Sequence, residues 1–211
     1  AINAVSQQTG VTAVDTGLDK GGVKLTAADG RNIVTGAYTT VTAASTGLGA
    51  ASTTNTGSFT LNSDKAIAIT SNLNGAVSTG GIKAAGLTVG TYTAQTAFAS
   101  TTNAAAAVVG SLTKIAAGDF TINGVQVGSS LASSDTASSV GKDASGISKA
   151  AAINAISDKT GVTATANATV VQGASMTAAA LTGTLTINGV ATATFSTTTD
   201  AAASRKATVN A

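Results

Sequence analysis

The chain has 211 residues, a formal net charge of +2 and 9% charged residues, and it contains no Cys, His, Trp, Pro or Glu. The absence of Cys and His excludes disulfides, thiolate sites and the commonest metal and acid–base chemistries. The few basic residues are scattered and no apolar run approaches the roughly 20 residues that cross a membrane, so the sequence predicts neither a nucleic-acid partner nor a membrane partner.

The N-terminal residues predict the end of a helix followed by a short strand. The helix end covers 2–8, and Gly10 comes next as a residue suited to the left-handed conformation that closes helices. Residues 11–14 then alternate in a way that favours a strand. The sequence therefore begins in the middle of a supersecondary unit and lacks the basic start and apolar core of a signal peptide.

Two hairpins are expected in the first third of the chain. Apolar alternation flanks Asp29-Gly30, a standard turn pair, over residues 23–35. A second pair of short alternating runs lies within 59–70, on either side of 63–65. Between the hairpins, 39–56 is rich in Thr, Ala, Gly and Ser and predicts a surface loop or a weak strand.

The middle of the chain contains the most complete unit. Residues 120–127 alternate around Asn123-Gly124, which predicts a hairpin with a type I′ turn. A loop over 128–146 precedes Ile147, Ile153 and Ile156, whose helical spacing predicts a helix near 147–159. An Ala-rich stretch at 94–109 is also compatible with a helix.

The unit is completed by a helix-ending glycine, Gly161, and a strand over 162–165, and it then begins again. Residues 184–195 repeat the hairpin. Asp200 is expected to cap a helix over 200–211, because its carboxylate can accept the free backbone N–H groups at a helix start.

Two phrases recur along the chain. The segment 2–13 returns at 153–164, and the phrase at 120–125 returns at 185–190. Repetition of this kind indicates an array of one supersecondary unit whose copies need neighbours to bury their apolar faces. We therefore expect an α+β fold of short antiparallel hairpins and a few short helices, in repeated ββαβ-type units.

The repeats predict two parts: an N-terminal part over 1–110, with half a repeat and further hairpins, and a repeat-containing part over 111–211. The two ends carry complementary halves of one unit. We therefore expect them to lie close together, as is common in native domains. Ile187 and Phe195 should then pack near Val5 and Val11, as Ile122 should pack near Ile156 and Val162.

Two short motifs match those of serine acyl enzymes. Ser111-Leu112-Thr113-Lys114 fits the S-x-x-K pattern and Lys159-Thr160-Gly161 fits K-T-G. However, the second motif stands where the first repeat has Gln8-Thr9-Gly10, which predicts a helix-end turn, and no S-D-N is present. We therefore expect no catalytic residues and no enzyme activity.

Acidic pairs and a glycosylation motif are weaker candidates. Asp15 with Asp19, or Asp135 with Asp143, lack the dense oxygen pattern of a calcium loop, so we expect turn formers or caps and neither a metal site nor a cofactor. Asn167-Ala168-Thr169 is an N-glycosylation triplet of the kind that arises by chance in a Thr-rich chain.

Other polar groups are interpreted as solvated surface. Three lysines near the predicted helix are expected on its exposed face: Lys142, Lys149 and Lys159. Gly47-Leu48-Gly49 lacks the third glycine of a phosphate-binding loop. Runs of Ser and Thr are expected to be exposed β-prone surface, with O-linked sugars as the alternative: Thr39-Thr40, Thr53-Thr54, Thr101-Thr102 and Ser196–Thr199.

The repeated phrase Ile-Asn-Ala-x-Ser-x-x-Thr-Gly-Val-Thr-Ala, with the Thr-Ile-Asn-Gly-Val hairpin, resembles the "IN" repeat of bacterial flagellins and hook-associated proteins. The stretch 25–33 is similar to the segment that comes after that repeat in flagellins, and the match is clear over 1–36 and 118–211. The long terminal helices by which flagellins polymerise have no counterpart here.

The resemblance implies an extracellular, surface-exposed variable region of a flagellar filament subunit, exported without a cleaved signal peptide. It implies assembly with other flagellin subunits through regions outside this sequence. With few aromatic residues and no sustained apolar stripe, this chain itself is expected to be monomeric. Host antibodies or surface glycans are further candidate partners. The alternatives are a filament-cap or hook-associated domain and an extracellular Thr/Ser-rich adhesin module.

Overall fold

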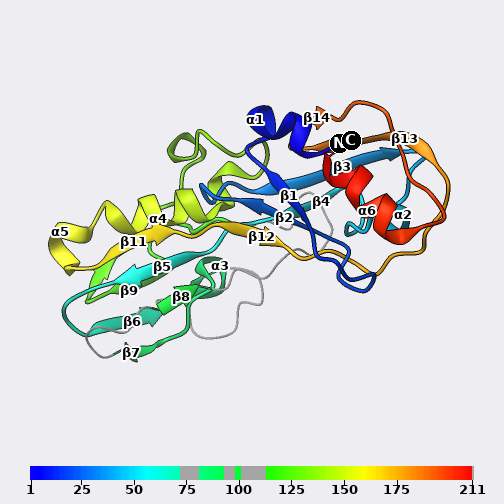
Figure 1. Cartoon of the computed structure of the whole chain (residues 1–211). Helices are drawn as coiled ribbons and strands as arrows, with labels where there is room; N and C mark the ends of the chain where they lie inside the picture. Colours follow the sequence, from blue (N-terminus) through cyan, green and yellow to red (C-terminus); the bar gives the residue numbers. More distant parts are fainter. Residues whose placement is uncertain (72–80, 93–97, 101–112, 211) are drawn as a thin grey trace.

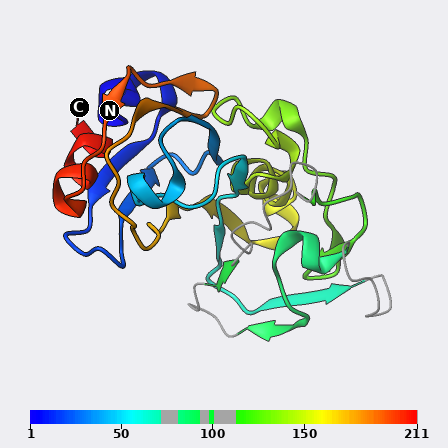
Figure 2. The ribbon, with the colours of Figure 1, turned by 90° about the vertical axis from the view of Figure 1, so that its right-hand side faces the viewer.

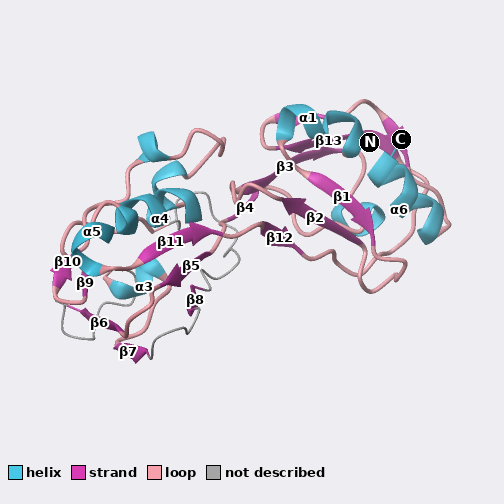
Figure 3. Ribbon diagram, turned by 60° about the vertical axis from the view of Figure 1, so that its left-hand side comes forward, coloured by secondary structure: helices cyan, strands magenta, loops and turns pink. Residues whose placement is uncertain are grey.

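The computed structural model describes residues 1–71, 81–92, 98–100 and 113–210. Short helices and antiparallel sheets alternate along the chain, which confirms the expected α+β class. The elements form two lobes that lie side by side (Figure 3). We call them the terminal lobe, built from 1–55 and 169–210, and the inserted lobe, built from the described residues of 59–166.

The terminal lobe contains both ends of the chain. It has two antiparallel sheets, ordered β1-β2-β12 and β14-β13-β3-β4, with β15 also paired to β13. Its strands are β1 (Thr12–Asp15), β2 (Val23–Ala27), β3 (Ile33–Thr39), β4 (Thr53–Asn55), β12 (Thr169–Val171), β13 (Thr182–Ile187), β14 (Val190–Ala191) and β15 (Phe195–Ser196). Its helices are the 3₁₀ turn η1 (Asn3–Val5), α1 (Ser6–Thr9), α2 (Ala43–Thr46) and α6 (Ala201–Asn210).

The inserted lobe repeats this plan. Its sheets are ordered β11-β5-β8 and β10-β9-β6-β7. Its strands are β5 (Phe59–Asn62), β6 (Ile67–Ser71), β7 (Gly90–Tyr92), β8 (Phe98–Ser100), β9 (Phe120–Ile122), β10 (Val125–Gln126) and β11 (Thr163–Ala166). Its helices are α3 (Ile82–Ala85), α4 (Gly146–Asn154) and α5 (Ser157–Thr160), with 3₁₀ turns η2 (Ala132–Ser134) and η3 (Lys142–Ala144).

Apart from β15 and the 3₁₀ turns, the described elements of the two lobes come in the same order when the terminal lobe is followed from β2 through its C-terminal helix and on to its N-terminal strand. Register agrees as well. Ala13 lies opposite Leu25 in the terminal lobe, and Ala164 lies opposite Leu61 in the inserted lobe. The inserted lobe therefore interrupts the terminal lobe between β4 and β12, and the terminal lobe is a circular permutation of the same fold.

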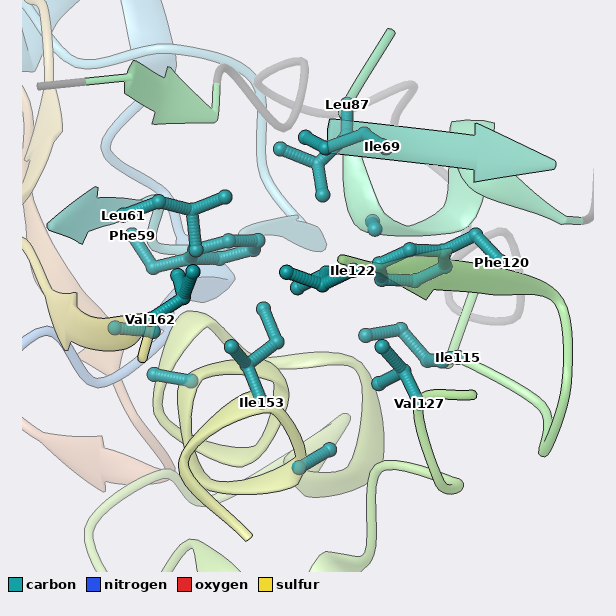
Figure 4. Close-up of a cluster of buried hydrophobic side chains, with 14 of the residues drawn as sticks. Phe59, Leu61, Ile69, Leu87, Ile115, Phe120, Ile122, Val127, Ile153 and Val162 are labelled. Carbon is teal, nitrogen blue, oxygen red and sulfur yellow. The ribbon is translucent and has the colours of Figure 1, made fainter. Parts of the chain in front are cut away.

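Each lobe has its own apolar core, and Figure 4 shows the core of the inserted lobe. There, Ile153 of α4 points toward Phe59 and Leu61 of β5 and Ile122 of β9. The core of the terminal lobe combines residues from both ends of the chain with those of 23–48. Neither core is confined to 1–110 or to 111–211, because each of them combines residues from both ranges.

The two Asn-Gly hairpins form as the sequence predicts. β9 pairs with β10 and β13 pairs with β14, with two-residue turns between them. Asn123 and Gly124 have φ of 49° and 79°, and Asn188 and Gly189 have 51° and 86°. Positive φ at both central residues is the requirement of a type I′ turn, which the Asn-Gly pair meets at low cost.

The other two expected hairpins are wrong. The chain does turn after β2, where Gly30 has φ 80° and donates its N–H to Ala27, but β2 pairs with β1 and β12 while β3 pairs with β13 and β4. Likewise β5 and β6 belong to different sheets. In both lobes the turn carries the chain from one sheet to the other.

The stretch 39–56 contains more order than expected. Thr42 and Ser45 form a reciprocal capping box that starts α2, and Gly47 ends the helix in the left-handed conformation. Leu48 is fully buried in the terminal core, and Gly47 of this segment serves the helix end. Within 94–109, the described part is strand β8, which overturns a helix there; the rest lies outside the described residues.

Candidate functional site

The two ends of the chain meet, as Figures 1 and 2 show. The amino group of Ala1 donates to the carbonyl of Ala207 at 2.9 Å, and the N–H of Ile2 donates to Thr208 at 2.9 Å. The side chains of Asn3 and Asn210 are hydrogen bonded at 3.0 Å. The N-terminal residues thus continue the hydrogen-bond pattern of α6.

The apolar packing expected from this closure is present except at Val5. Val11, Ile187 and Phe195 share the terminal core, and Ile122, Ile156 and Val162 lie together in the inserted one. Val5 is half-buried and is not part of the terminal cluster. The two halves of the unit therefore bury each other's apolar faces, as the repeat logic requires.

The Asn of each "Ile-Asn" phrase holds a helix end to the following strand. Asn3 accepts the N–H of Ala13 at 2.7 Å and donates to its carbonyl at 3.0 Å. Asn154 makes the same two bonds with Ala164, at 2.7 and 2.8 Å. This pair of contacts explains why the amide recurs, and it assigns the residue to the scaffold.

The Asn of each Asn-Gly turn has a second task besides its positive φ. Asn123 accepts the N–H of Ala68 at 2.7 Å and donates to the carbonyl of Thr160 at 2.8 Å. In the terminal lobe, Asn188 likewise accepts from Val34 at 2.7 Å and donates to Thr9 at 3.0 Å. Each turn therefore ties a neighbouring strand to the end of the repeat helix.

The serine acyl-enzyme motifs are not brought together as a described site. Ser111 lies outside the described residues. Lys114 forms a long ion pair with Asp143, at 3.9 Å. Lys159 and Thr160 lie in the last turn of α5, which Gly161 ends with φ 69°. The helix-end interpretation of K-T-G is thereby confirmed.

Asp15 and Asp19 do lie together, and both bind the cationic side chain of Arg205. The guanidinium of Arg205 on α6 donates to Asp15 at 2.6 Å and also to Asp19. Burial opposes ionisation of Asp15, but the N–H of Gly17 and the Arg205 guanidinium outweigh it, so the pKa of Asp15 lies below its usual value. The sequence did not single out Arg205, because nothing in its neighbours marks it for burial.

Asp135 and Asp143 take separate partners. One oxygen of Asp135 accepts the N–H groups of Ala137 and Ser138, both at 2.9 Å, which makes it a turn former as expected. In the described parts of the chain, no three acidic side chains gather in a way that could hold a metal ion.

Two side chains of the glycosylation triplet make contacts within the fold. The amide of Asn167 donates to Ser58 at 3.1 Å and accepts from Thr60 at 3.0 Å. Thr169 is buried in sheet β1-β2-β12. In the folded chain the Asn167 amide is therefore hydrogen bonded, and the Thr169 side chain is buried.

Two expectations of exposure hold only in part: Lys159, Thr39-Thr40 and most of Ser196–Thr199 are exposed, but three other residues are buried. Lys149 is 3% exposed rather than part of a solvated face, and burial lowers its pKa to about 8 against the opposing charge of Asp143. Thr54 and Thr197 are buried too, while Thr101-Thr102 lies outside the described residues. The sequence placed the three lysines on an exposed helix face, but the turns η2 and η3 of the loop over 128–146 pack against α4.

Comparison with known proteins returned no matching family model, no similar curated protein and no similar solved structure. Among the described residues, none of the helices has the length and apolar character of a membrane span.

Proposed function

We propose that this chain is a surface-exposed outer region of a bacterial flagellin and serves as a structural part of the flagellar filament. The observation that carries the proposal is the use of the repeated phrase. In both copies, its Asn, Thr and Gly residues bind backbone groups of the same unit. Residues that bind the backbone of their own unit have the structural role of a scaffold.

The meeting of the chain's two ends supports this role. Residues 1–2 extend the hydrogen-bond pattern of α6, so both ends leave the molecule at one place. A domain with adjacent ends can project from a longer subunit without disturbing the part that polymerises. The outer region then decorates the filament and sets its surface and antigenic character, and it carries no catalytic step.

The test is immunogold electron microscopy with antibodies raised against the isolated chain. Labelling along the whole length of intact filaments is expected, and deletion of this region from the encoding gene should leave filaments that no longer bind the antibody. Label at the filament tip or hook alone would favour a cap or hook-associated protein instead. Label on the cell body with bare filaments would favour an adhesin, and either result overturns the proposal.

A further inference from the structure

A non-covalent connection joins the two lobes besides the two linkers of the chain. The linkers are 56–58, between β4 and β5, and 167–168, between β11 and β12. They run side by side, because the N–H of Asn167 donates to the carbonyl of Ser58 at 2.9 Å. Lobes joined by so narrow a connection are expected to move relative to each other unless a further contact holds them.

The further contact is made by Asn32 of the terminal lobe and the loop over 128–146 of the inserted lobe. The backbone N–H of Asn32 donates to Ser138 Oγ at 2.8 Å, and its Nδ2 donates to the carbonyls of Val140 and Gly141 at 2.9 and 3.1 Å. Asn32 is fully buried and Ser138 is 2% exposed. These bonds resist opening of the junction, since a buried donor or acceptor that is left unpaired is costly.

The duplication of the fold shows that a lobe does not itself need the amide of Asn32. Val34 and Ala68 occupy equivalent positions, because each donates its N–H to the Asn of an Asn-Gly turn. Two residues before them stand Asn32 in the terminal lobe and Ala66 in the inserted lobe. Ala66 is exposed, whereas Asn32 is fully buried. The amide therefore serves the junction rather than the repeated unit.

The loop over 128–146 is also an addition to the repeated unit. In the terminal lobe, the connection from β14 to α6 covers 192–200, whereas the equivalent connection from β10 to α4 covers 127–145. The longer connection includes η2 and η3, which pack against α4. Its extra length brings the acceptors of the inserted lobe to Asn32.

The loop holds Ser138 in a fixed place. Asp135 Oδ1 accepts the N–H groups of Ala137 and Ser138, both at 2.9 Å, and Asp135 is 1% exposed. A buried carboxylate that accepts two backbone N–H groups fixes the conformation of a turn. The hydroxyl that accepts the N–H of Asn32 is therefore attached to a stiff part of the inserted lobe.

We infer that the loop over 128–146 is a strap that holds the inserted lobe in one orientation to the terminal lobe through Asn32, so that the two lobes move and unfold as one unit. Each lobe has its own apolar core, so without the strap each would unfold as a separate unit. With the strap in place, unfolding of either lobe leaves buried polar groups of the other lobe unpaired, and this couples the two.

Differential scanning calorimetry of the whole chain tests whether the lobes unfold together. Wild type should show one transition, with a ratio of calorimetric to van't Hoff enthalpy of about 1. Asn32→Asp places a carboxylate against the carbonyls of Val140 and Gly141. It should split the transition or raise the ratio to about 2, the value for two independent units of similar size. Asn62→Asp makes the same chemical change on the exposed end of β5 and should leave the ratio unchanged.

Spin-label distances test the same coupling in the folded protein. The chain contains no Cys, so Lys159→Cys and Lys206→Cys place one label each on exposed positions of α5 and α6, which lie in different lobes (Figure 3). The distance distribution from pulsed electron resonance should be narrow in the otherwise wild-type chain. It should broaden with Asn32→Ala, which removes both Nδ2 donors without adding a charge.

Two results would overturn the inference. One is a wild-type chain that already unfolds in two transitions. The other is a single transition and a narrow distance distribution in both Asn32 variants, because other contacts would then hold the lobes together.

Discussion

At the scale of single residues, the fold depends on a few backbone conformations that the sequence marks clearly. Gly124 adopts φ 79° and a Cβ added there would meet no atom within 4 Å. Replacing it with Val therefore costs only the strained conformation, at least about 1–2 kcal/mol for a residue with a Cβ. Gly128→Val is the matched control, because that position also has open space but no positive φ. Urea unfolding should show a lower free energy of unfolding for Gly124→Val and an unchanged one for Gly128→Val. Equal unfolding midpoints for the two variants would contradict the type I′ turn.

The side chain of Asn123 tests the second task of the turn. Asn123→Ala removes bonds to Ala68 and Thr160 and also places Ala at φ 49°. Two lost hydrogen bonds should lower the free energy of unfolding by about 1–3 kcal/mol, with a further loss from the conformation. Asn62→Ala, on the exposed end of β5, is the control. Its free energy of unfolding should stay within about 0.5 kcal/mol of the wild-type value.

At the scale of elements, short-range signals were reliable and long-range pairing was not. The Asn-Gly turns and the helix-ending Gly161 could be predicted, because each is decided by the φ of one or two residues. The turn at Asp29-Gly30 was also real, but its strands separate into two sheets. Local sequence specifies a turn, whereas the partner of a strand depends on apolar faces contributed from far along the chain. For the same reason, the burial of Lys149 could not be predicted.

The ion-pair cluster of α6 gives a prediction with a pH dependence. Replacing Arg205 with Met should cost about 1–3 kcal/mol at pH 7, between the values for exposed and buried pairs. The pKa of Asp15 is lower in the folded state than its ordinary 3.8. Its contribution is therefore present above the unfolded pKa and lost as the pH falls through the lower folded pKa.

The wild type should accordingly lose more stability than Arg205→Met when the pH falls from about 5 to below 3.8. Lys206→Met is the control on the same helix: its side chain is exposed, and it should retain most of the wild-type pH dependence. Urea unfolding of the three proteins at several pH values measures the difference. Parallel curves for wild type and Arg205→Met would show that the cluster contributes nothing to acid sensitivity.

At the scale of the whole molecule, the sequence showed the repeat but hid the duplication of the entire lobe. Only the hairpin, helix and following strand are similar in sequence between the copies. The strands that complete each lobe, such as β3 and β6, take the same place in the sheet although their sequences differ. Thr35 lies opposite Ile187 as Ile69 lies opposite Ile122, but only the pairing of β3 with β13 then shifts register. Pairing demands alternation and apolar content rather than particular residues, so two different strands can serve one position. The expected meeting of the ends was inferred from the half units and is confirmed.

Equivalence of the lobes predicts that the break in the chain can be moved from one lobe to the other. In the terminal lobe the chain is interrupted after α6, which ends at Asn210 one residue before the last, yet Ala1 and Ile2 still bond to the last turn of α6. The repeat places this break opposite Ala151 and Ala152 of α4. A permuted chain that omits Ala211, joins Asn210 to Ala1 and opens between Ala151 and Ala152 should therefore regain the same fold, because each lobe keeps its complete set of packing partners.

The stability that α6 gains from a continuous chain should offset the stability that α4 loses where it is opened. We therefore expect a far-UV circular dichroism spectrum equal to that of wild type. The free energy of unfolding should lie within about 1–2 kcal/mol of the wild-type value. A control permutant opened at Thr121, inside β9, cuts a strand that pairs on both sides and should not fold. If the α4 permutant is as unstructured as this control, α4 and α6 cannot replace each other as the place of the chain break. The lobes would then share a fold without sharing the interactions that stabilise it.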